Sequence, residues 1–199
     1  MILRVNEIHS LSANARRFAL LIGFLLAIVA LYWPVPQVLV GLWLDGERTT
    51  YTHGFLVAAV SAWLLWRGRT LAGAPDARPI SPALLVMTVA ALSLLALGWQ
   101  ISYRAGIALA TELLLLPILW LAVLAVFGRN AARAVAVPLA FMLFAIPLWD
   151  ALTPLLQSAS IFASRLLLRT VGVPAYFEDN RVSIPEGTFQ IEGGCSGLH

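Results

Sequence analysis

The sequence contains a single cysteine, Cys195, within the stretch Gly-Gly-Cys-Ser-Gly at residues 193–197. A thiol becomes a strong nucleophile when it loses its proton, and the free N–H groups at a helix N-terminus favour the thiolate. Flanking glycines would let a peptide substrate approach closely. The local chemistry leaves two interpretations open for Cys195: a catalytic nucleophile, or an inert buried cysteine.

Two further ionisable residues stand in apolar surroundings, His53 and Glu112. His53 is either a catalytic group or, together with Tyr51, a substrate-positioning or structural residue at the membrane surface. Glu112 either pairs with Arg104 or lines a cavity. The free-energy cost of a carboxylate in lipid predicts that its side chain faces other helices. No spacing typical of metal ligands or phosphate loops occurs, so we predict neither a metal nor a cofactor.

The composition is that of an integral membrane protein. Of the 199 residues, 60% are hydrophobic and only 12% are charged, and the mean hydropathy is +0.86. Soluble domains of this length have far more charge. The seven tryptophans are interpreted mainly as anchors at the ends of membrane spans, Trp43 and Trp99 among them, and they do not suggest a nucleic-acid surface.

The hydrophobic runs predict an all-α polytopic bundle. After a cytoplasmic tail at residues 1–17, the bundle occupies residues 18–149 with about five spans. The expected spans are residues 18–33, 51–66, 83–100, 105–127 and 134–148. A span needs about 20 residues to cross a hydrocarbon core of about 30 Å, and the last run is short for that purpose.

Arginine is the only basic residue type besides histidine, and its distribution predicts the topology. With the N-terminus in the cytoplasm, eight arginines before residue 149 lie inside and two lie outside. Those inside are Arg4, Arg16, Arg17, Arg67, Arg69, Arg78, Arg129 and Arg133, and those outside are Arg48 and Arg104. This asymmetry fits the positive-inside rule and places the segment after the fifth span outside the membrane.

The remaining residues divide into a helix and a polar segment. Residues 150–172 contain an amphipathic helix that starts at Thr153 and Pro154; it lies in the interface, or it is a sixth span that would make Cys195 cytoplasmic. Residues 173–199 are predicted to be periplasmic. There RVSI and TFQIE flank a proline turn, which indicates a β-hairpin or two extended segments that lead to Cys195.

Three stretches together resemble the exosortase and archaeosortase family. They are YTHGFLVAAVSAWLLWRGR, FAIPLWDALTPLLQSAS and GVPAYFEDNRVSIPEGTFQIEGGCSGLH, in this order. The resemblance implies a membrane cysteine protease or transpeptidase of the bacterial inner membrane, with Cys195 as its nucleophile on the periplasmic side. It also implies substrates: exported proteins with a C-terminal sorting signal of the PEP-CTERM type, which contains a hydrophobic helix.

Family members continue beyond the cysteine with an arginine and a histidine that are thought to assist it. The present chain has four residues after Cys195, so we expect it to be C-terminally truncated and inactive by itself. His199 is interpreted as an ordinary first-turn helix residue. The alternative function is a transporter or channel subunit with a non-catalytic cysteine, although only Glu112 and a few serines and threonines lie in the middle of the spans. An acyltransferase would require a loop histidine and acid that we do not find.

Overall fold

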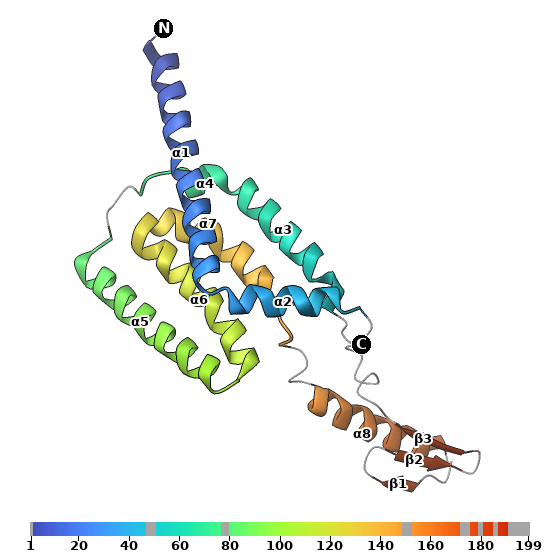
Figure 1. Ribbon diagram of the computed structural model, residues 1–199. Helices are drawn as coiled ribbons and strands as arrows, with labels where there is room; N and C mark the ends of the chain where they lie inside the picture. The colour runs from blue at the N-terminus through green and yellow to red at the C-terminus, as the bar shows by residue number, and fades with distance from the viewer. Residues whose placement is uncertain are drawn as a thin grey trace. The chain divides into compact units, whose positions relative to one another are not determined.

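The computed structural model describes residues 2–46, 51–76, 80–148, 153–171, 176–178, 181–184 and 187–190 (Figure 1). The chain divides into two compact units, Met1–Ile146 and Pro147–His199. Each unit is described separately below.

Unit 1 is built of helices. In chain order they are α1 (Ile2–Leu31), α2 (Pro34–Leu44), the 3-10 turn η1 (Tyr51–His53), α3 (Gly54–Arg67), α4 (Arg69–Gly73), α5 (Pro82–Arg104), α6 (Ala108–Phe127), α7 (Arg129–Phe141) and the 3-10 turn η2 (Met142–Ala145). Three segments are long and apolar enough to cross a membrane: Ala13–Leu31, Pro82–Arg104 and Ala108–Phe127. The chain is therefore an α-helical membrane protein.

The other two expected spans form helices that are shorter than predicted. α3 has 14 residues and α7 has 13, which at about 1.5 Å per residue gives helices of roughly 20 Å. α1, by contrast, begins at Ile2, so residues assigned to a tail continue the first helix. Hydrophobic runs located these helices, but their ends are set by neighbouring segments.

Two helices were not expected, the five-residue α4 and the longer α2. The chain turns at Tyr32 and Trp33, and α2 begins at Pro34, because a proline in the first helical turn lacks only an N–H that would have no partner there. In Figure 1, α2 leaves the direction of α1 and runs across the bundle toward α3. It packs against η1, α3 and α6.

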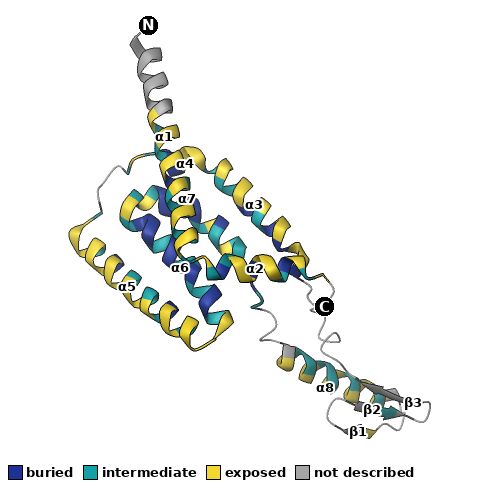
Figure 2. Ribbon diagram, viewed as in Figure 1, coloured by how far each residue is buried: buried dark blue, intermediate teal, exposed yellow. Residues whose placement is uncertain are grey.

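Most of the buried hydrophobic side chains of unit 1 form two clusters. Figure 2 marks the buried residues along the ribbon in dark blue. The first joins α2, η1, α3, α5, α6 and the end of η2, with Val35, Trp43, Tyr51, Trp99, Leu119 and Ile146 among its members. The second joins α1, α4, α6 and α7 through Phe18, Leu21, Ala72, Val123, Ala131 and Val135. Each cluster therefore holds together segments that are far apart in sequence.

The second cluster borders an arginine-rich end of unit 1. The ring centroids of Phe18 and Trp66 are 6.1 Å apart, which brings the first half of α1 next to the end of α3. The arginines here are Arg16, Arg17, Arg67, Arg69, Arg129 and Arg133, and we call this region the arginine end. The structure thus gathers on one side most of the arginines that the sequence assigned to the cytoplasm.

Asp76 fixes the start of α7 at the arginine end. Its carboxylate accepts hydrogen bonds from the backbone N–H groups of Arg129, at 2.6 Å, and Asn130, at 2.8 Å. These N–H groups have no partner within the helix. The N-terminus is also the positive end of the helix dipole, which attracts the carboxylate. A Cβ atom at Gly128 would overlap this carboxylate, and Gly128 has a φ of 92° that favours glycine.

Unit 2 contains a helix and a small sheet among its described residues. α8 spans Thr153–Val171, which agrees with the predicted helix, and it is not among the segments long and apolar enough to cross a membrane. Three strands follow: β1 (Tyr176–Glu178), β2 (Arg181–Ile184) and β3 (Gly187–Gln190), antiparallel in that order. Val182 pairs with Phe177 and with Phe189. β1 was not foreseen from the sequence.

We predict that loss of the Asp76 carboxylate destabilises unit 1. Asp76→Ala should lower the free energy of unfolding by about 1 kcal/mol, the usual contribution of a capping side chain. Asp76→Asn keeps an oxygen that can accept one hydrogen bond and should lower it less. Titration of the purified protein with a denaturing detergent measures both, and equal stability of Asp76→Ala and the unchanged protein would contradict this role.

Candidate functional site

The predicted nucleophile, Cys195, lies outside the described residues, as do His199 and the Gly-Gly-Cys-Ser-Gly stretch. The role of Cys195 therefore stays a prediction from the sequence. Of the stretches that carry the resemblance, the structure describes residues 51–69 of the first and residues 144–148 at the start of the second. We call residues 51–54 the YTHG segment and residues 144–148 the FAIPL segment.

The YTHG and FAIPL segments meet in the fold, although they are far apart in sequence. Nε2 of His53 lies 3.0 Å from the carbonyl oxygen of Phe144. A carbonyl can only accept a hydrogen bond, so this ring nitrogen carries the hydrogen. His53 itself is exposed at this end of unit 1. The contact gives His53 a direct part in fixing the position of the FAIPL segment.

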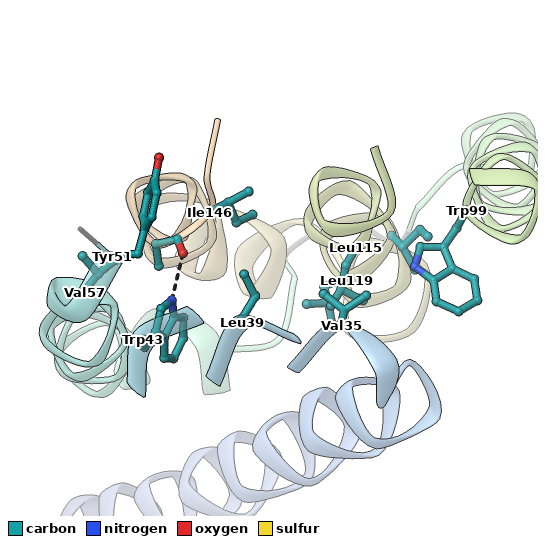
Figure 3. Close-up of a cluster of buried hydrophobic side chains, with 11 residues drawn as sticks. Val35, Leu39, Trp43, Tyr51, Val57, Trp99, Leu115, Leu119 and Ile146 are labelled. Atoms are coloured by element: carbon teal, nitrogen blue, oxygen red, sulfur yellow. Dashed lines mark hydrogen bonds between the residues drawn. The ribbon is translucent and has the colours of Figure 1, made fainter. Parts of the chain in front are cut away.

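Trp43 makes a second, parallel contact from α2. Its indole N–H donates to the carbonyl oxygen of Ala145 at 3.0 Å, and this bond is buried (Figure 3). The final carbonyl groups of a helix have no partner within it, and Pro147 has no N–H to offer the carbonyl of Phe144. Trp43 and His53 thus supply donors to two consecutive carbonyls where η2 ends.

The glycine of the YTHG segment is explained by the same packing. A Cβ atom on Gly54 would overlap the indole ring of Trp43. The ring of Phe55 meets that indole edge-on, with centroids 5.3 Å apart. Tyr51 is buried, and its ring centroid lies 5.7 Å from that of His53. Close approach of α3 to α2 therefore requires a residue without a side chain at position 54.

In the structure the rings of Tyr51 and His53 lie together, and Trp43, which the sequence analysis did not assign to a site, contacts the same part of the chain. Trp43 and Trp99 were expected to be interfacial anchors, but each is only 8% exposed and belongs to the first cluster. Trp33 and Trp66 are 59% and 58% exposed, as anchors should be. Position near the end of an apolar run could not distinguish a buried tryptophan from an exposed one. Trp43, for example, is buried because α2 packs against α3 and α6.

Glu112 faces other helices, as predicted. It is 3% exposed, and its Oε2 atom has no hydrogen-bond partner. Within the described residues, no ion pair joins it to Arg104, which is exposed. Glu112 instead lines a cavity of about 180 Å³ together with Val35, Tyr103 and Thr111. Of the two expectations for Glu112, the structure supports the cavity.

The described residues contain no group of three or more His, Cys, Asp or Glu side chains that could hold a metal ion. The meeting of the YTHG and FAIPL segments fixes an exposed imidazole, a buried tyrosine and Ile146, the last residue of unit 1, relative to each other. The segment that carries Cys195 follows Ile146 in the chain.

We predict that Trp43→Phe lowers the free energy of unfolding by about 1–3 kcal/mol, because it leaves the buried carbonyl of Ala145 without its donor. Trp33→Phe makes the same exchange at an exposed position and should change stability by less than about 0.5 kcal/mol. Denaturing-detergent titration of both variants provides the measurement. A similar loss in the two variants would argue against the hydrogen bond as the cause.

The chain was compared with known protein families. The model of the transmembrane exosortase family matches residues 43–199, from Trp43 through the YTHG and FAIPL segments to the end of the chain. No curated protein and no solved structure matched the chain.

Proposed function

Because the chain belongs to the transmembrane exosortase family, we propose that it is a membrane cysteine protease or transpeptidase for C-terminal sorting signals of the PEP-CTERM type. The observation that carries this proposal is the extent of the family match. It covers residues 43–199 and so includes the YTHG segment, the FAIPL segment and the only cysteine. The substrates would be exported proteins whose signal contains a hydrophobic helix within the bilayer.

In the proposed reaction the thiolate of Cys195 attacks a peptide carbonyl carbon of the substrate. The tetrahedral intermediate collapses with cleavage of the C–N bond, and the leaving nitrogen takes up a proton as the C-terminal segment departs with a new amino group. The remainder of the substrate stays bound as a thioester. Water then yields a free carboxylate, or an amine yields a new amide bond.

The distribution of charge supports a location of Cys195 outside the inner membrane. The arginine end of unit 1 should face the cytoplasm under the positive-inside rule. Contacts in the first cluster put η1, with His53, beside the end of η2, which is followed by Ile146 and the chain of unit 2. We therefore propose that α8, the strands and Cys195 lie on the periplasmic side, with α8 in the interface.

We propose that His53 and Tyr51 act as positioning residues. His53 holds a backbone carbonyl of the FAIPL segment, which is a structural contact, and the buried Tyr51 packs beside it. The family match favours this function over a transporter or channel subunit. The feature closest to a transporter or channel is the cavity lined by Glu112. One buried carboxyl group does not make a transport path.

The test of the proposed nucleophile is processing of a tagged substrate in cells that express the complete gene. Cys195→Ala should leave the substrate uncleaved while the membrane level of the protein stays near normal. Cys195→Ser should fail almost as completely, since a hydroxyl is a far weaker nucleophile than a thiolate near neutral pH. Substantial cleavage by Cys195→Ala would rule out the cysteine mechanism.

A pair of variants separates a positioning role of His53 from a catalytic one. The amide of His53→Gln can still donate to the carbonyl of Phe144, but an amide cannot serve as a base near neutral pH. We expect His53→Gln to keep most of the processing activity and His53→Ala to lose at least tenfold. If both variants folded normally and were equally inactive, His53 would have to take part in the chemistry.

A further inference from the structure

A groove at the arginine end is lined by residues from three helices. It has a volume of about 370 Å³ and lies between the first half of α1 and the junction of α3 with α4. Its floor is apolar and consists of Ala15, Phe18, Ala19 and the ring of Trp66. Its polar lining consists of Asn14, Arg69 and Thr70.

The charge of this groove is positive. The guanidinium carbon of Arg69 lies 4.6 Å from the centre of the Trp66 ring, and its Nη1 donates to the carbonyl oxygen of Trp66 at 3.3 Å. A guanidinium has five N–H donors, so one such bond uses a small part of its capacity. Arg16 and Arg17 lie on α1 beside the groove residues, and Arg67 precedes the junction.

The described contacts of the Arg69 guanidinium are with Trp66, through its ring and its carbonyl oxygen. The carboxylate of Asp76 accepts hydrogen bonds from the N–H groups that open α7. A ligand with a negative charge therefore complements the polar lining.

The position of the groove indicates that the ligand also has an apolar part. It opens beside the span Ala13–Leu31, near the end of that span where the arginines gather. Trp63 and Trp66 are more than half exposed there, with Arg67 and Arg69 over their rings, an arrangement typical of the layer of lipid head groups. A molecule that lies on Phe18, Ala19 and Trp66 must present an apolar part below its charge.

We propose that this groove binds one anionic phospholipid, with its phosphate at Arg69, Thr70 and Asn14 and the upper part of an acyl chain along Ala15, Phe18 and Ala19. Basic recesses between membrane helices bind acidic head groups in this manner. The bound lipid holds α1 to α3 and α4, which are otherwise joined here by side-chain packing of the second cluster. This site is independent of the proposed peptidase function.

Retention of lipid by the purified 199-residue chain tests the charge requirement. The protein in neutral detergent is mixed with phosphatidylglycerol or with phosphatidylcholine of the same acyl chains, and bound lipid is counted by native mass spectrometry. We expect one phosphatidylglycerol to be retained in preference to phosphatidylcholine. Arg69→Gln should weaken this retention about fivefold, the effect of one basic residue at an anionic membrane surface.

Arg133→Gln is the matched control, because Arg133 is an exposed arginine of the same end on α7 and does not line the groove. It should leave retention within about twofold of the unchanged protein. Equal weakening by Arg69→Gln and Arg133→Gln would overturn the proposal, since it would indicate diffuse attraction to the whole arginine end. Equal retention of the two lipids by the unchanged protein would overturn it as well.

The apolar half of the site has its own test. Ala19→Phe fills the groove without a change of charge and should abolish the preference for phosphatidylglycerol, whereas Ala62→Phe, at an exposed position of α3 outside the groove, should keep it. Thermal unfolding of each variant without lipid shows that it is folded. Glycerol 3-phosphate alone should not raise the unfolding temperature, and stabilisation by it equal to that by phosphatidylglycerol would mean that the groove binds a soluble phosphate instead.

Discussion

The fold of unit 1 depends on how the two ends of the short helix α7 satisfy their backbone groups. A buried N–H or carbonyl group left without a partner costs free energy, and of the contacts at these ends the bond from Trp43 to Ala145 is buried. At the start of α7, Asp76 accepts from the N–H groups of Arg129 and Asn130. At the end of η2, which continues α7, Trp43 and His53 donate to consecutive carbonyls. A helix of 13 residues is thereby fixed at both ends by other parts of the chain.

These end contacts explain why the two segments of the family match lie together. α3 must approach α2 closely enough for His53 to reach Phe144 while Trp43 reaches Ala145, and Gly54 removes the side chain that would prevent it. The buried Tyr51 and Ile146 then close the first cluster around the same point. A histidine, a glycine and a tryptophan that are separate features of the sequence are therefore parts of one packing arrangement.

The sequence predicted those features that depend on local composition. Hydrophobic runs located the helices of the bundle, the amphipathic pattern located α8, and the distribution of arginines anticipated the arginine end. What could not be predicted depends on contacts between distant residues. Asp76 resembles any loop aspartate until α7 is placed against it, and Trp43 resembles an interfacial anchor until α2 folds across the bundle. The prediction for Cys195, in contrast, rests on sequence and family alone.

The packing at the end of η2 also bears on how the proposed nucleophile is positioned. Ile146 is 1% exposed and ends unit 1, so the chain that leads to Cys195 leaves from a point that packing holds in place. Loss of the indole N–H of Trp43 removes the buried hydrogen bond to Ala145, the residue just before Ile146. Peptide cleavage requires the thiolate and the substrate carbonyl to be aligned closely, and misplacement by about 1 Å can cost a hundredfold in rate. Under the proposed function we expect substitutions at Trp43 and His53 to act through the packing before Ile146, and rescue by a side chain that restores the hydrogen bond is the sign of that mechanism.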